Sequence, residues 1–259
     1  MSAGQRPSGA RPGGGLVDLD APGMCGALSA AGLGVGAALR PPRAGRPPVD
    51  PRVRRAWHRR RLSWMPYLWH RLKAEDLAWA EAWQARVQQR LCQWERVRFG
   101  PGCFVAPEAR IFAEPGREVV FGAGCLIGAG VMVHGPAQFG DRVSLNPFAH
   151  IEGGAGGVVV GDDTRIAAQV RIFAWDHGMD PGLPIREQSV RSRGVRIGTD
   201  VWLGAGVGVT DGVCIGDHAV VGMGAVVTRD LPAWSVAVGA PARVVGDRRR
   251  GRVGPAAQP

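Results

Sequence analysis

The chain has 259 residues, including 40 Gly and 20 Pro, and a formal net charge of +10. This length is enough for one large domain with appendages. No stretch has the ~20 strongly apolar residues of a membrane-spanning helix. The five Cys form no Cys-X-X-Cys pair and are odd in number, which argues against a disulfide framework and predicts a reducing compartment, the cytoplasm.

The positive charge is concentrated at the two ends of the chain. Residues 1–98 and 247–259 are strongly basic, whereas residues 99–246 carry more acidic than basic side chains. The net charge of the whole chain is therefore no argument that the central region binds nucleic acid, and we expect no nucleic-acid partner.

Residues 1–50 are rich in Gly, Ala, Pro and Arg and have few large apolar side chains. Such a composition cannot bury enough surface to fold, so this segment is predicted to be disordered. The run from Gly23 to Leu39 resembles the core of a signal peptide. It is mostly Gly, Ala and Ser and lacks a clear processing site, so we do not expect secretion.

Residues 51–98 form an Arg/Trp-rich segment that contains six of the nine Trp. Its second half has apolar residues at helical spacing, which predicts an amphipathic helix packed on the following region. These residues are Leu77, Ala80, Trp83, Val87, Leu91 and Trp94. The first half, residues 52–72, mixes Arg with Trp. It is either a weak membrane-surface contact, because both residue types suit a lipid interface, or a solvated helical cap whose Trp side chains are buried.

From Phe99 to Val227 apolar residues recur every six positions, a period typical of a parallel β-helix. The series is Phe99, Val105, Ile111, Phe121, Ile127, Val133, Phe139, Leu145, Ile151, Val160, Ile166, Ile172, Ile197, Leu203, Val209, Ile215, Val221 and Val227. Three repeats make one triangular coil, which predicts six coils, at 99–116, 121–138, 139–156, 160–177, 197–214 and 215–232. Small or β-branched residues two positions earlier are predicted to point inward as well.

The longest interruption of the period, residues 173–196, contains His177. Of the six His in the chain it alone lies in a long excursion from the repeats, where functional residues concentrate. The repeat ends near Pro232, and residues 233–246 are predicted to close the solenoid. Residues 247–259 are predicted to be a basic disordered tail.

Several motifs make the chain similar to the hexapeptide-repeat acyltransferases, with maltose, galactoside and polysaccharide O-acetyltransferases as the nearest kin. They are Ile197-Gly198-Thr199-Asp200-Val201-Trp202-Leu203-Gly204-Ala205, Val221-Gly222-Met223-Gly224-Ala225 and Gly239-Ala240-Pro241-Ala242-Arg243. The resemblance covers residues 99–246. It implies an all-β solenoid, a left-handed parallel β-helix. It also implies an acetyl-CoA-dependent O-acyltransferase acting on a sugar or glycan hydroxyl, without a metal, in homotrimers whose active sites lie between subunits.

The resemblance also implies which residues act. His177, in Trp175-Asp176-His177-Gly178, matches the catalytic His, and Asn146 matches an Asn of the family's site. Kin place Asp residues beyond that Asn, where this chain has Glu152-Gly153-Gly154. The acetyl-CoA path is implied to be lined by Trp202, Ala205, Met223, Gly224, Thr228, Arg229 and Arg243, with Arg248 to Arg250 as additional cations.

Acyl transfer from a thioester to a hydroxyl needs a base and a donor for the oxyanion. His177 is predicted to be the base. Asp176, Asp180, Glu187 or a backbone carbonyl could orient its ring, and the oxyanion donor is expected to be the N–H of Gly204 or Ala205.

The phase of the repeat places Asn146 and His177 at different corners of the triangle. One face of a coil spans ~15–20 Å, so the two side chains are predicted to meet only across a subunit interface.

Other function classes remain open. A γ-type carbonic anhydrase has the same fold but needs three His as metal ligands, two of them five residues apart, and the His spacing here offers no such pair. Two further alternatives are an acetyltransferase that acts on serine or an antibiotic, and a β-helix that binds partners without catalysis.

Overall fold

The computed structural model describes residues 50–250. The predicted disordered segments therefore lie outside the described residues, except for Asp50 and residues 247–250. The signal-like run from Gly23 to Leu39 also lies outside them. Within the described part, four cysteines are free thiols: Cys92, Cys103, Cys125 and Cys214. Every helix there is too short or too polar to cross a lipid bilayer.

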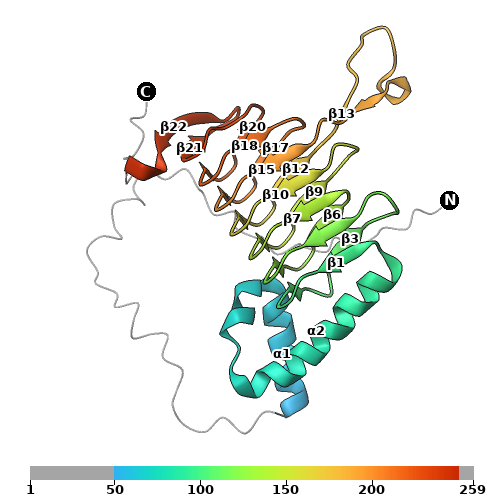
Figure 1. The fold of residues 1–259 in the computed structure, drawn as a ribbon, viewed down its shortest axis with the longest axis vertical. Helices are drawn as coiled ribbons and strands as arrows, with labels where there is room; N and C mark the ends of the chain where they lie inside the picture. Colours follow the sequence, from blue (N-terminus) through green and yellow to red (C-terminus); the bar gives the residue numbers. More distant parts are fainter. Residues whose placement is uncertain (1–49, 251–259) are drawn as a thin grey trace, which may run out of the picture. The chain divides into compact units, whose positions relative to one another are not determined.

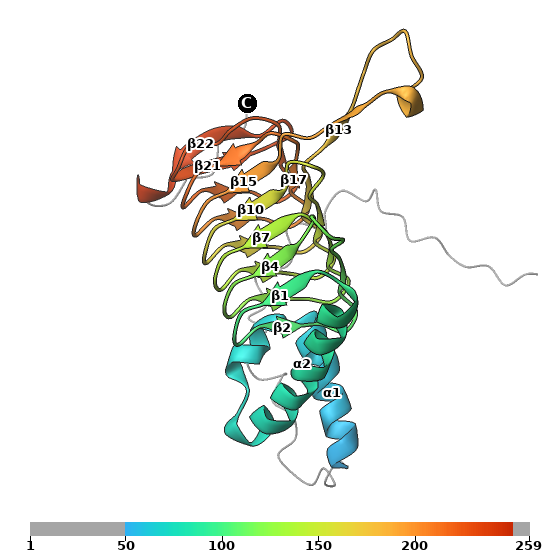
Figure 2. The ribbon, with the colours of Figure 1, turned by 45° about the vertical axis from the view of Figure 1, so that its right-hand side comes forward.

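The main body is a parallel β-helix of about six coils with three sheets (Figures 1 and 2). The first sheet contains β1 (Val97–Phe99), β4 (Val119–Phe121), β7 (Ala137–Phe139), β10 (Val158–Val160), β15 (Val195–Ile197) and β18 (Cys214–Ile215). The second contains β2 (Phe104–Val105), β5 (Leu126–Ile127), β8 (Ser144–Leu145), β11 (Arg165–Ile166), β16 (Trp202–Leu203), β19 (Val220–Val221), β21 (Ser235–Val238) and β22 (Arg243–Asp247). The third contains β3 (Arg110–Phe112), β6 (Met132–His134), β9 (His150–Glu152), β12 (Arg171–Phe173), β17 (Gly208–Val209) and β20 (Val226–Val227).

The six-residue period marks the core, as predicted. Every residue of the series from Val105 to Val227 is buried, and Phe99, on the first coil, is partly buried. The small or β-branched residues two positions earlier are buried too, for example Val131 and Val207. Phe121 stacks on Phe99 and on Phe139 with ring centroids 5.2 and 4.7 Å apart. Equivalent positions of successive coils thus pack directly on one another.

The glycines that follow several core residues are required by the close approach of neighbouring coils. A Cβ on Gly198 would lie 2.2 Å from the Asp217 carboxylate and 2.7 Å from its backbone nitrogen. That carboxylate accepts a hydrogen bond of 2.8 Å from the Thr199 N–H. The glycine of such an Ile-Gly pair therefore leaves room for a carboxylate of the next coil, which accepts a hydrogen bond from a backbone N–H at the corner.

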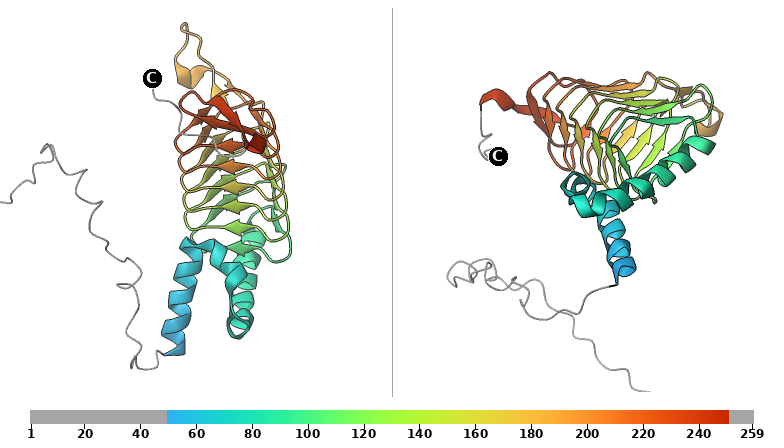
Figure 3. Two further views of the ribbon diagram at one scale, coloured as in Figure 1. Left: turned by 90° about the vertical axis from the view of Figure 1, so that its left-hand side faces the viewer. Right: turned by 60° about the horizontal axis from the view of Figure 1, so that its bottom comes forward.

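A helical cap covers the first coil (Figure 3). It consists of α1 (Pro51–Trp64), the 3-10 helix η1 (Pro66–Arg71) and α2 (Ala74–Trp94). The first coil has no preceding coil, so cap side chains bond its free backbone edge. Gln84 donates to the Val105 carbonyl (3.0 Å) and accepts from the Val105 N–H (2.8 Å). Gln88 donates to the Cys103 carbonyl and Trp69 to the Gly102 carbonyl.

The predicted buried face of the second helix is correct at its centre and wrong at its ends. Ala80, Trp83 and Val87 are buried, whereas Leu77 is exposed and Trp94 is 78% exposed. The helix has 21 residues and so is about 30 Å long, longer than the ~15–20 Å of one coil face. Its ends therefore extend beyond the surface that it covers.

The other end of the solenoid is closed by the antiparallel pair β21–β22 and the 3-10 helix η3 (Arg248–Arg250). The predicted disordered tail thus starts too early, because residues 247–250 have regular structure. Arg248 donates to the Asp200 carboxylate (2.8 Å) and Arg249 to the Asp247 carboxylate (2.6 Å). The hydrogen bond with His218, and those from Arg248, hold the pKa of Asp200 below its ordinary value.

Gln84→Ala should lower the free energy of unfolding by about 1–3 kcal/mol, because it leaves the buried N–H and C=O of Val105 unpaired. Gln89, exposed on the same helix, is the matched control, and Gln89→Ala should change stability by less than about 0.5 kcal/mol. Urea denaturation followed by circular dichroism compares the two. Equal unfolding midpoints would contradict the role given to Gln84.

Candidate active site

The interruption of the repeat forms an arm that projects from the solenoid after β12 (Figures 1 and 2). Its strands β13 (Asp176–His177) and β14 (Val190–Arg191) pair antiparallel, with His177 opposite Val190. A short 3-10 helix, η2 (Ile185–Glu187), lies near its tip. His177 is thus carried on a hairpin outside the coils.

The base of the arm is fixed by two side chains. The Ser192 hydroxyl donates to the Ala174 carbonyl and accepts from the N–H groups of Ala155 and Gly156 (2.9 and 2.8 Å). The buried Asp211 carboxylate accepts from the N–H groups of Arg193 and Gly194 and from the Arg193 guanidinium. The entering and leaving strands are therefore both tied to the solenoid.

The loop of the arm is organised by Gln188. Its Oε1 accepts from the Asp180 N–H (2.7 Å), and its Nε2 donates to the carbonyls of Asp180 (2.9 Å) and Leu183 (2.8 Å). One side chain thus supplies three hydrogen bonds to a loop that contributes no buried apolar residue. The loop keeps a defined shape without a core of its own.

The imidazole of His177 is exposed and lies edge-to-face with Trp175, with 5.3 Å between ring centroids. It borders a hollow of about 550 Å³ whose wall includes Arg191, Arg193 and Asp211. Within residues 50–250 none of the three carboxylates suggested as its orienting partner is hydrogen-bonded to it. Asp180 bonds its own loop and Glu187 pairs with Arg186.

The arm presents large apolar side chains to solvent. Met179 is 86% exposed, and Leu183, Ile185 and Val190 are each more than half exposed. Clusters of exposed apolar residues on soluble proteins mark surfaces that contact another molecule. The arm therefore has the surface character of an element that packs against a partner.

Asn146 lies at the edge between the second and third sheets, directly after β8. Its Nδ2 donates to the Ile166 carbonyl of the next coil (2.9 Å). This bond fixes the amide and leaves its Oδ1 as the group that can accept from a ligand. Phe148, two residues later, adopts a left-handed conformation (φ 64°) and is exposed.

Three predicted donor-binding residues lie on the same edge, two to three coils further along: Ala205, Met223 and Gly224. A fourth, Trp202, begins β16, the strand that leads to this edge. The side chains of Trp202 and Met223 are exposed. The Gly204 N–H is used within the solenoid, donating to the Val221 carbonyl (2.8 Å). No group of residues 50–250 accepts from the Ala205 N–H, whereas its counterpart Ala129 donates to the Ser63 carbonyl of α1 (2.8 Å). Of the two backbone donors suggested by sequence, the one at Ala205 is unpaired within the described chain.

The predicted phosphate-binding residues are separated from these four. Thr228 and Arg229 follow β20 at the edge between the third and first sheets, the edge from which the arm leaves, and Arg243 begins β22. Arg229 and Arg243 are exposed, and neither pairs with a carboxylate among residues 50–250. By contrast, Arg248 and Arg249 pair with Asp200 and Asp247.

One chain does not assemble the predicted site. Asn146 leaves β8 of the second sheet, whereas His177 follows β12 of the third sheet and extends outward on the arm. Sequence reasoning did not identify Ser192, Asp211 or Gln188, which hold the arm. Asp211 lies in an ordinary corner triplet, Thr210-Asp211-Gly212, so no local signal distinguishes it.

The chain is similar in sequence to a family of bacterial transferases and to several proteins named as acetyltransferases. A family model described as bacterial transferase hexapeptide (six repeats) matches residues 194–229. A putative lipopolysaccharide biosynthesis O-acetyl transferase of Escherichia coli, WbbJ, is 34% identical over 140 residues, which cover 49% of this chain and 71% of that protein. A probable acetyltransferase of Mycobacterium tuberculosis is 40% identical over 122 residues, 44% of this chain but only 38% of that protein.

Among solved structures, AntD, an N-acyltransferase from Bacillus cereus crystallised with dTDP and coenzyme A, superposes with a TM-score of 0.56. It is 23% identical, over 63% of this chain and 90% of that one, and shows that the fold is shared. The extent of the Escherichia coli alignment, together with the six-residue repeat, shows that the chain belongs to the hexapeptide-repeat acyltransferase family.

Proposed function

We propose that this protein transfers an acetyl group from acetyl-CoA to a hydroxyl of a sugar or glycan, in a homotrimer whose active sites lie between subunits. The observation that carries the proposal is the arm. It holds His177 away from Asn146 and Ala205 of its own chain and exposes apolar residues around it. A neighbouring subunit whose second–third edge met the arm would bring these groups together and cover that surface.

The chemistry follows from the groups that would then face each other. The imidazole of His177 accepts the proton of the acceptor hydroxyl, whose oxygen attacks the thioester carbonyl carbon. The Ala205 N–H of the neighbouring subunit, which has no acceptor among residues 50–250 of its own chain, donates to the resulting oxyanion. The C–S bond then breaks, and the imidazolium returns its proton to the CoA sulfur. The products are an O-acetyl ester and CoA.

The Asn146 amide is proposed to position the acceptor, since its Nδ2 is held by Ile166 and its Oδ1 remains available. A saccharide acceptor is favoured by the name of the Escherichia coli relative, a putative lipopolysaccharide O-acetyl transferase. Trp202, Met223 and Gly224 would flank the pantetheine arm, and Thr228, Arg229 and Arg243 the phosphates. The absence of a disulfide pattern fits a cytoplasmic enzyme.

His177→Asn should lower kcat by about 10²–10⁴-fold, because it removes the base without changing the size of the side chain much. Release of CoA thiol from acetyl-CoA, measured with a panel of saccharide, serine and antibiotic acceptors, checks this. His70→Asn is the control, since His70 is exposed on the cap. Full turnover by the His177 variant would refute the base assignment.

Mixing two inactive variants tests the shared site. If each site takes His177 from one subunit and Asn146 from its neighbour, then co-refolding His177→Asn with Asn146→Ala should restore about one quarter of the sites. A site inside one chain would give no recovery, because every subunit would carry one defect. The same variants refolded separately provide the baseline for turnover.

Arg229→Gln and Arg243→Gln should each raise the KM for acetyl-CoA about tenfold and change kcat little, because each removes a charge that can pair with phosphate. With S-acetyl-pantetheine, which lacks the nucleotide phosphates, both variants should match the wild type. Arg110→Gln, on the opposite end of the solenoid, is the control. A defect that persists with S-acetyl-pantetheine would contradict phosphate binding.

A further inference from the structure

Helix α1 carries an aromatic stripe that is largely exposed; only at its last turn does it meet the solenoid, where Trp64 lies edge-to-face with Phe148, with 5.4 Å between ring centroids. Val53, Trp57, Arg60 and Trp64 are spaced four, three and four residues apart and so share one face of the helix. The three apolar members are 48%, 69% and 46% exposed. Spacing of this kind normally marks the face that a helix buries, yet here it is the face left open.

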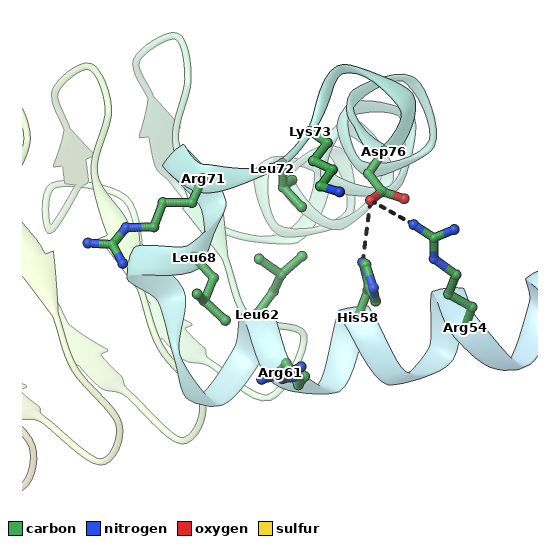
Figure 4. Close-up of a pocket in the computed structure, with 9 residues that line it drawn as sticks. All are labelled: Arg54, His58, Arg61, Leu62, Leu68, Arg71, Leu72, Lys73 and Asp76. Carbon is green, nitrogen blue, oxygen red and sulfur yellow. Dashed lines mark ion pairs between the residues drawn. The ribbon is translucent and has the colours of Figure 1, made fainter. Parts of the chain in front are cut away.

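The orientation of α1 is set by its opposite face. Figure 4 shows Arg54 and His58 of α1 directed at Asp76 of α2, with distances of 3.6 and 3.7 Å to the carboxylate. Asp76 is largely buried, and Leu62 on the same side of α1 is 2% exposed. A helix held by a buried carboxylate and a buried Leu cannot roll to bury its aromatic stripe without breaking both contacts.

The helix that carries the stripe is rich in arginine. Helix α1 has six Arg and no acidic residue beyond its N-cap, Asp50. Arg60 and Arg61 are exposed and have no carboxylate partner among residues 50–250. Both line a hollow of about 470 Å³ next to the stripe, together with Trp57, Trp64 and Met65. Arg59, by comparison, lies over the rings of Trp79 and Trp83.

We propose that this face of α1 docks on the surface of an anionic lipid bilayer. Tryptophan rings prefer the boundary between headgroups and acyl chains, and arginines pair with the lipid phosphates. A symmetric contact with a second copy would instead place Arg60 and Arg61 against their own counterparts, a like-charge arrangement. The cap lies at the end of the solenoid opposite to β22 (Figure 1), so docking through α1 leaves the arm and the last coils facing solution. The proposal is independent of the proposed function.

The experiment measures binding of the full chain to vesicles by co-sedimentation. Vesicles of phosphatidylcholine and phosphatidylglycerol in equal parts should bind the protein, and those of phosphatidylcholine alone should bind it at least about tenfold more weakly. Trp57→Ala/Trp64→Ala and Arg60→Gln/Arg61→Gln should each lower binding to anionic vesicles about tenfold or more. Added salt should weaken the binding of the wild type.

Each variant has a matched control elsewhere on the cap. Trp94→Ala removes a tryptophan that is more exposed than either stripe residue, and Arg86→Gln/Arg90→Gln removes two exposed arginines of α2. All variants keep both termini, so the charge of the termini is the same in every protein compared. Thermal unfolding confirms that each variant folds.

Three results would overturn the proposal. One is equal binding to neutral and anionic vesicles, and another is an equal loss in the stripe and control variants. The third is a change in subunit association, or in affinity for single-stranded DNA, caused by the stripe variants without a change in vesicle binding. The first two would show that the contact is not specific to this face and to anionic lipid, and the third would assign the face to another partner.

Discussion

The structure depends on the direct stacking of one coil on the next. Each core position lies against its counterpart in the neighbouring coils, and each coil donates backbone hydrogen bonds to the next, as from Gly198 to Ile215. Such a solenoid is stabilised by contacts between neighbouring coils, and their buried side chains together form one continuous core. A single slip in register would turn the core residues of a strand outward. This constraint explains why the period is kept so strictly and why departures from it are confined to the corners.

Because each coil depends on its neighbours, the first and last coils of the solenoid both have to be covered. A first coil has a backbone edge without a partner, which would otherwise pair with another chain. The cap supplies Gln84, Gln88 and Trp69 to that edge, while β21–β22 closes the other end. The cap then has a second face, on α1, whose side chains are largely exposed. The cap that completes the fold through α2 thus also carries the Arg/Trp surface, on α1.

The arm at the interruption of the repeat is not part of the stacked coils and leaves their register unchanged. Coils on both sides of the arm remain in register, since Val158 of β10 pairs with Val195 of β15 across the insertion. The arm can therefore extend from a rigid base without disturbing the coils. It is held by Ser192 and Asp211, so His177 stands on a defined support. The proposed chemistry needs this combination of rigid support and outward reach.

The sequence by itself determined the β-helix, its core positions, the corners that separate Asn146 from His177, and the single excursion that carries a His. These follow from periodicity, which is a local property. It did not determine which backbone N–H remains unpaired at the turn of residues 204–205, because Gly204 is satisfied by Val221, a residue of another coil. Nor did it reveal that Asp211 holds the arm, that Trp94 and Leu77 lie beyond the covered end of the solenoid, or which tryptophans of the cap are buried. Those features depend on distances between residues far apart in the chain, and only the tertiary structure decided them.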